Sequence, residues 1–186
     1  YLKEKQKTDE SFLPDGWFMT GDISQFNADG TISIIDRKKN IFKLSQGEYV
    51  APEKIENILS KHHLIMQSFV HGDSFRDKLV AVIVPDPASF LPWASNLLGH
   101  PSPAPTLQEL CHNSIINAKF LKIVQDAGRA AKLAGFEIPR AVYLEPHEFD
   151  IDSNELLTPT LKLKRSEATK YYANTIQSLY KSLESH

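Results

Sequence analysis

The chain has 186 residues, of which 41% are hydrophobic and 24% charged, a composition typical of a globular protein rather than a disordered one. Its 21 basic and 23 acidic residues give a net charge of −2, which excludes a bulk positive field for nucleic acid or an anionic membrane. The single cysteine, Cys111, excludes a disulfide framework and a thiolate zinc cluster. The longest unbroken apolar run, residues 79–84, is far shorter than the ~20 residues that span a bilayer.

The first 15 residues are polar and end in turn-forming residues. They contain neither an initiator methionine nor the apolar core of a secretory signal, so we expect the chain to be the later part of a longer one. Residues 17–23 predict a short extended stretch. Residues 23–26 and 31–35 predict a β-hairpin, because the intervening Asp29-Gly30 pair supplies the positive backbone angles of a tight turn.

A polar junction over residues 36–40 separates this hairpin from a new apolar pattern. Residues 41–44 predict a brief strand, followed by a turn at 46–48. Pro52 suits the first turn of a helix, where its missing N–H has no cost, and apolar residues at helical spacing predict an amphipathic helix over 52–61.

The rest of the chain alternates short strands with helices. The predicted elements are strands over 64–70 and 78–84, a helix over 88–98, a proline-rich loop over 100–106, a helical stretch over 107–133 divided near Asn117, a strand over 140–144, an acidic irregular segment over 145–157, and a closing helix over 166–183. Because the strands are short and the hairpins local, an α+β fold is favoured over a doubly wound sheet.

Several common kinds of catalytic site have no support in the sequence. Seven histidines are present, but His62 and His63 are adjacent, no pair has helical ligand spacing, and no cysteine lies nearby, so we expect no metal site. Neither a nucleophile elbow nor a phosphate-binding P-loop occurs. We interpret Cys111, which has apolar neighbours in a predicted helix, as a small buried hydrophobic residue.

Two basic clusters and one aspartate remain as candidates. The clusters are Arg37, Lys38, Lys39 and Lys43, and Lys162, Lys164, Arg165 and Lys170. Each cluster alone is most often a solvated surface, yet both lie in irregular chain, where cations can clamp a phosphate-bearing ligand. Asp22, at the end of the predicted strand, has the chemistry to accept hydrogen bonds from a sugar diol; the alternative is a turn or cap aspartate.

These features occur in the order of known motifs. The segments are Gly16-Trp17-Phe18-Met19-Thr20-Gly21-Asp22, then Ile35-Asp36-Arg37-Lys38-Lys39, then Leu157-Thr158-Pro159-Thr160-Leu161-Lys162-Leu163-Lys164-Arg165. Together they resemble the late core motifs of the acyl-adenylate-forming enzymes. The unbroken stretch over 43–56, and Thr160-Leu161 where other branches carry Ser-Gly, resemble the long-chain fatty acyl-CoA synthetases.

The resemblance covers essentially this whole chain but only the last quarter of a typical family member. It implies that residues 1–35 are the tail of a large N-terminal domain, that Asp36 is a hinge, and that residues 37–186 are a mobile C-terminal lid. The implied fold of the lid is α+β, with a small mixed or antiparallel sheet flanked by helices.

The implied activity is that of a ligase in two steps. A fatty acid and ATP, with Mg²⁺, give acyl-AMP, and coenzyme A then displaces AMP. The resemblance implies that Asp22 holds the ribose, Arg37 contacts the nucleotide, and Lys162 reaches the α-phosphate. In the second step the lid swings, Gly47 lines the route of the pantetheine arm, and Lys43 takes part.

Elementary chemistry agrees with these roles. A lysine stabilises the negative charge that develops during adenylation, and its flexible stem suits a moving part. Gly47 has no Cβ, so its backbone can approach a ligand closely. Hinges are a few residues at the ends of elements, where Asp36 is expected to lie.

Other interpretations stay open. We expect no turnover from this chain alone, and the alternative to a ligase fragment is a free-standing module that binds a nucleotide or a protein. Nucleic-acid binding is disfavoured by the near-zero net charge and the absence of interleaved aromatic residues. The resemblance implies a cytoplasmic location, or the cytosolic face of an internal membrane reached through regions outside this chain; it does not define an oligomeric state.

Overall fold

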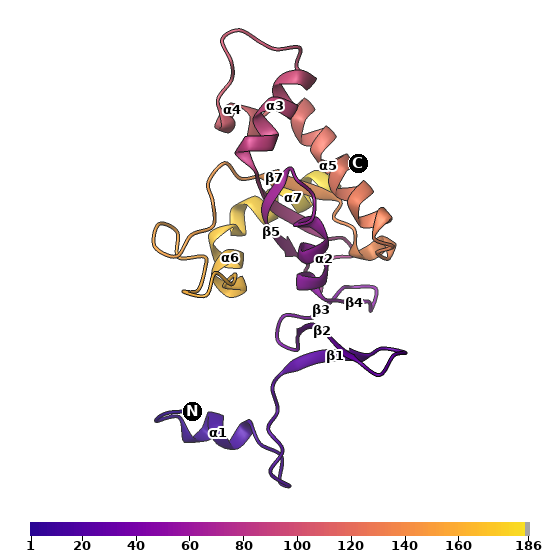
Figure 1. Cartoon of the computed structure of the whole chain (residues 1–186), viewed down its shortest axis with the longest axis vertical. Coiled ribbons are helices and arrows are strands. Elements are labelled where there is room, and N and C mark those ends of the chain that lie inside the picture. The colour runs from indigo at the N-terminus through magenta and orange to yellow at the C-terminus, as the bar shows by residue number, and fades with distance from the viewer. Residues whose placement is uncertain (185–186) are drawn as a thin grey trace.

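A three-stranded mixed sheet forms the centre of the molecule (Figure 1). The computed structural model describes residues 1–184. The sheet order is β5 (Ile65–His71), β6 (Val80–Pro85) and β7 (Ala141–Leu144). β5 pairs with β6 in antiparallel orientation and β6 pairs with β7 in parallel. The mixed sheet agrees with the α+β class expected from the sequence.

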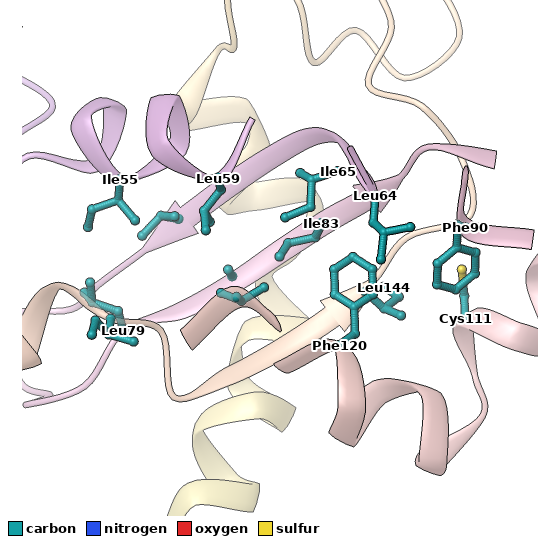
Figure 2. Packing of buried hydrophobic residues seen from close by; sticks show 14 of the residues in the cluster. Ile55, Leu59, Leu64, Ile65, Leu79, Ile83, Phe90, Cys111, Phe120 and Leu144 are labelled. Atoms are coloured by element: carbon teal, nitrogen blue, oxygen red, sulfur yellow. The ribbon is translucent and has the colours of Figure 1, made fainter. Parts of the chain in front are cut away.

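Helices cover both faces of this sheet because its central strand is apolar on both sides. Every residue of β6 is buried. Ala81 and Ile83 lie in the core beneath α2 (Pro52–Leu59) and α5 (Ser114–Ala130). Val80, Val82 and Val84 lie in a second core with α6 (Arg165–Tyr171) and α7 (Ala173–Glu184). Figure 2 shows the first core, with Ile55 and Leu59 of α2 pointing into it.

The connection from β6 to β7 is helical and well packed. It contains α3 (Pro87–Leu97), α4 (Leu107–Cys111), α5 and a short 3-10 turn, Gly135–Glu137. Phe90, Trp93 and Phe120 meet with ring centroids 5.7–5.9 Å apart. In Figure 1, α3 and α4 lie at the end of the molecule opposite the N-terminus. No helix within residues 1–184 is both long and apolar enough to cross a membrane.

The N-terminal elements lie at the other end of the molecule (Figure 1). They are α1 (Lys5–Glu10) and the antiparallel pair β1 (Asp22–Phe26) and β2 (Ile32–Arg37). The small hairpin of β3 (Phe42–Lys43) and β4 (Tyr49–Val50) lies between this pair and α2, and Leu44 and Val50 belong to the first core. No residue between 1 and 35 is buried. This part of the chain therefore has no core of its own.

Most predicted elements are confirmed, and four details are wrong. The helix α1 lies within the segment interpreted only as polar chain. The extended stretch over 17–23 is a strand only from Asp22, where β1 begins, and before it only Phe18 is paired, in an isolated bridge with Phe12. Asp22 therefore begins β1 instead of following a strand. The left-handed backbone of Gly21, at φ +75°, makes the bend immediately before it.

Two helical boundaries also differ from the prediction. The stretch over 107–133 divides at His112 and Asn113, not near Asn117, because the Asn113 side chain accepts hydrogen bonds from the N–H groups of Ile115 and Ile116 and so starts α5. The closing helix is two helices that meet at Tyr172, a residue buried against the sheet.

Candidate functional site: a cleft lined by lysine and arginine

A cleft of about 980 Å³ lies between the chain around the end of β2, helix α2 and the loop that precedes α6. Its charged lining residues are Arg37, Lys39, Glu53, Glu56, Lys162, Lys164 and Arg165. The fold thus brings together members of the two basic clusters, which are far apart in the sequence. Lys38 and Lys170 do not line the cleft, and Lys170 instead forms an ion pair with Glu167 at 3.1 Å.

The cations of the cleft differ in whether they have a carboxylate partner. Arg165 pairs with Glu56, and Arg37 pairs with Asp22. Within residues 1–184, Lys39, Lys162 and Lys164 have no ion-pair partner. Three uncompensated ammonium groups on one concave surface form a site suited to a phosphate-bearing ligand.

Asp22 and Arg37 face one another across the β1–β2 ladder. The two residues are paired in register, and Arg37 Nε lies 2.8 Å from Asp22 Oδ1. Arg37 Nη1 also donates to the carbonyl of Thr20 at 3.1 Å. A partly exposed surface pair of this kind adds only about 0–1 kcal/mol to stability, so a ligand can displace it at low cost.

Asp36 is almost fully enclosed, with 1% of its surface exposed. Its Oδ1 accepts hydrogen bonds from the Arg37 N–H at 2.7 Å and from Asn40 Nδ2 at 3.1 Å, and its Oδ2 accepts from the Glu53 N–H at 2.9 Å. The residue at the N-cap of α2, Ala51, has no capping side chain. Asp36 therefore supplies both the missing acceptor and a negative charge at the positive end of α2.

Lys162 lies at the tip of a narrow loop. The stems of this loop are joined by the Leu157–Leu163 bridge and by the Lys164 N–H donating to the Leu156 carbonyl at 2.8 Å. At the tip, the Lys162 N–H donates to Thr158 Oγ1 at 3.1 Å, and Leu161 has a φ of +59°. Lys162 itself is exposed, so the backbone is fixed while the ammonium group is free to move.

Lys43 and Gly47 lie together on the β3–β4 hairpin and do not line the cleft. Gly47 has a φ of +98°, which L side chains rarely adopt. Lys43 Nζ lies 5.6 Å from the centroid of the Tyr49 ring, within the range of a cation–π contact. The predicted site residues therefore fall into two groups, with Asp22, Arg37 and Lys162 at or beside the cleft and Lys43 and Gly47 apart from it.

The sequence did not reveal the roles of Glu56 and Asn40. Glu56 is the ion-pair partner of Arg165. Asn40 Nδ2 donates to both Asp36 Oδ1, at 3.1 Å, and Glu53 Oε1, at 2.9 Å, and so links these two side chains. No local pattern connects Glu56 to Arg165, because their contact spans 109 positions of sequence. Only the fold places them together.

Elsewhere, the interpretation of Cys111 is confirmed, since it is buried with 2% of its surface exposed. Over residues 1–184, no group of three or more His, Cys, Asp or Glu side chains is arranged to hold a metal ion.

Comparison with solved structures defines the class of protein. The adenylation domain of a carboxylic acid reductase from Segniliparus rugosus, solved with AMP and a co-purified carboxylic acid, matches with a TM-score of 0.80 and 31% sequence identity. The match covers 98% of this chain and 26% of that chain. The fold is that of the C-terminal part of an adenylate-forming enzyme, as the resemblance implied.

The curated relatives narrow the class. Long-chain-fatty-acid–CoA ligase 5 of Rattus norvegicus is 46% identical over 184 residues, which cover 99% of this chain and 26% of the rat protein. Fatty acyl-CoA synthetase B of Dictyostelium discoideum is 46% identical over 188 residues, with the same two coverages of 99% and 26%. No family model matches the chain. The chain is homologous to the C-terminal part of the long-chain fatty acyl-CoA synthetases and spans 26% of the length of these two relatives.

Proposed function

We propose that this chain serves as the C-terminal portion of a long-chain fatty acid–CoA ligase. In this proposal residues 1–35 end a larger domain, Asp36 is the hinge, and residues 37–186 are the lid. The names of the relatives support the activity, and the AMP in the related adenylation domain supports nucleotide binding. The observation that carries the proposal is the cleft shared by Arg37 and Lys162, which has unpaired cations and adjoins Asp22.

In the first step, a carboxylate oxygen of the fatty acid attacks the α-phosphorus of ATP, and pyrophosphate leaves. Negative charge concentrates where carboxylate meets phosphate, and the Lys162 ammonium would stabilise it. Lys162 suits this role because it is exposed and has no carboxylate to compete with the substrate within residues 1–184. Arg37 would contact the nucleotide and Asp22 would accept from the ribose hydroxyls.

In the second step, the thiol of coenzyme A attacks the acyl carbonyl carbon, and AMP leaves. Rotation of the lid about Asp36 would move Lys162 away from the acyl-adenylate and bring the β3–β4 hairpin to face it instead. Gly47 would let the pantetheine arm pass close to the backbone, and Lys43 would offer a cation on the same hairpin. The separation of Lys43 and Gly47 from the cleft supports a division of labour between two faces of the lid.

We assign Mg²⁺ to the phosphates of ATP and not to ligands from this chain. The two cleft carboxylates already have partners, because Glu56 pairs with Arg165 and Glu53 accepts from Asn40. Fatty acid, ATP and coenzyme A are the proposed substrates.

The proposed location is cytoplasmic, or on the cytosolic face of an internal membrane. Cell fractionation, with the protein detected by an antibody against this chain, would test this location.

The decisive experiment is Lys162→Ala in the complete gene product that contains this chain. We expect fatty-acid-dependent release of pyrophosphate to fall by about 10²–10³-fold, because a preorganised charge at the reacting centre is lost. Thioester formation from supplied acyl-AMP should stay within about threefold, since Lys162 is withdrawn in that step. Lys170→Ala is the matched control, because Lys170 lies outside the cleft.

Unimpaired adenylation in Lys162→Ala would remove the role given to this lysine. Nucleotide binding by the complete, unsubstituted gene product with no acyl-AMP formed for any fatty acid tested would overturn the ligase proposal. That result would favour the alternative, a non-catalytic binding module.

A further inference from the structure

Glu56 and Arg165 form a two-point ion pair at the wall of the cleft. Arg165 Nη1 donates to Glu56 Oε1 at 2.9 Å, and Arg165 Nη2 donates to the other carboxylate oxygen. Both side chains are largely enclosed, at 15% and 12% exposed for Arg165 and Glu56. Glu56 Oε1 also accepts from the Val70 N–H of β5 at 2.7 Å. The pair therefore joins α2, the sheet and the first residue of α6.

The guanidinium is held in this contact with its Nε–H group left without a partner within residues 1–184. Arg165 Nε is buried and has no hydrogen-bond partner within the described residues. A buried donor without a partner is costly, so the position of Arg165 is set by the two-oxygen contact with Glu56 and not by full satisfaction of its donors. A lysine at this position could not reproduce the contact, because its single ammonium group cannot donate to both carboxylate oxygens in the same planar, two-point geometry.

Arg165 follows directly on the loop that carries Lys162. The Lys164 N–H donates to the Leu156 carbonyl and closes the base of this loop, and Arg165 is the next residue and begins α6. A fixed Arg165 therefore fixes the C-terminal stem of the loop. The tip, with Lys162 three positions earlier, is joined to that stem only through the narrow ladder that includes the Leu157–Leu163 bridge.

The N-terminal end of α2 is bonded to Asp36. The Glu53 N–H in the first turn of α2 donates to Asp36 Oδ2 at 2.9 Å, and Glu56 lies one turn further along the same helix. Helix α2 thus makes a continuous connection from Asp36, through Glu53 and Glu56, to Arg165 and the Lys162 loop.

We infer that Glu56 and Arg165 are positioning residues for Lys162, and that through α2 they tie the orientation of the Lys162 loop to the backbone at Asp36. This inference rests on the proposed function. Neither residue needs to touch substrate. Their effect on adenylation passes through the lysine, so it should be absent when the lysine is absent.

A double-mutant cycle in the complete gene product tests this dependence. The variants are Arg165→Lys, Lys162→Ala and the two combined, with pyrophosphate release measured at saturating substrate and as a function of ATP. We expect Arg165→Lys to lower kcat by at least about tenfold with little change in the KM for ATP, because a small misplacement weakens an interaction made in the transition state. In the Lys162→Ala background, Arg165→Lys should cause no further loss beyond about twofold.

Arg129→Lys is the matched control, since Arg129 pairs with Asp126 on the exposed surface of α5, away from the cleft. If Arg165→Lys does not fold, Glu56→Gln replaces it in the cycle, because it keeps the side-chain volume while removing the charge. Equal fold-losses of Arg165→Lys with and without Lys162 would overturn the inference while leaving the ligase proposal intact. Full adenylation by Lys162→Ala alone would instead overturn the role of the lysine, and the inference with it.

Discussion

Cys111 illustrates how strongly an environment decides the chemistry of one side chain. It is buried at the end of α4, and burial, assisted by the negative charge of Glu145, raises the pKa of its thiol to about 12. Since the thiolate is the nucleophile, a thiol with this pKa is almost entirely protonated and unreactive at neutral pH.

We therefore expect Cys111 to resist alkylation in the native protein. Iodoacetamide at pH 8 should label it at least about a hundredfold more slowly than the same thiol in denaturant, because only the thiolate reacts. Mass spectrometry of timed samples measures both rates. In the 186-residue chain, which has no other cysteine to confuse the count, labelling at the denatured rate would mean that the core around α4 is open.

At the scale of elements, the start of α2 depends on an acceptor from outside the helix. Asp36→Ala removes the acceptor of three donors: the N–H groups of Arg37 and Glu53, and Asn40 Nδ2. Leaving buried donors unpaired costs about 1–3 kcal/mol, so we expect the free energy of unfolding to fall by about that amount. Urea denaturation measures the change.

Asp36→Asn is the matched variant, because it keeps the shape and one oxygen acceptor while removing the charge. Its loss of stability should be the smaller of the two. If both variants unfold at the wild-type urea concentration, Asp36 does not cap α2, and the connection from Asp36 to the Lys162 loop has no anchor at that end.

The elements that the sequence predicted well are those specified locally. The helix over 52–61 and the hairpin around Asp29-Gly30 follow from Pro52, from apolar spacing and from turn chemistry, all within a few residues. The boundary at Asn113 was missed because an asparagine within a helical stretch can be either an N-cap or an interior residue. Its backbone conformation decides between the two, and the sequence does not give that conformation.

The sequence also predicted some residues of the site and missed others, because it reveals local motifs but not long-range contacts. Motif order selected Arg37 and Lys162, and the structure places both on one cleft. Their catalytic roles stay predictions. The partners that hold the site are Glu56 for Arg165 and Asp36 for the first turn of α2. Both are long-range contacts that exist only once β2, α2 and α6 have come together in the fold.

At the scale of the whole molecule, stability is distributed very unevenly. Each residue of β6 is buried between two helical layers, whereas none of residues 1–35 is buried. The β1–β2 hairpin exposes large apolar side chains, among them Phe26 at 77% and Ile34 at 64%. A two-stranded ribbon without a covered face is only marginally stable by itself. This pattern fits our proposal that residues 1–35 belong to a larger domain.

Hydrogen exchange tests whether another part of the complete gene product covers the β1–β2 hairpin. In the 186-residue chain, amides of β1 and β2 should exchange at least about a hundredfold faster than those of β6, because the hairpin opens locally while β6 exchanges only on global unfolding. In the complete gene product, burial of Phe26 and Ile34 against the larger domain should slow exchange in the hairpin and leave β6 unchanged. Equal, rapid exchange of the hairpin in both proteins would contradict the proposed division at Asp36, because a hairpin packed against a larger domain should exchange more slowly than the same hairpin without that domain.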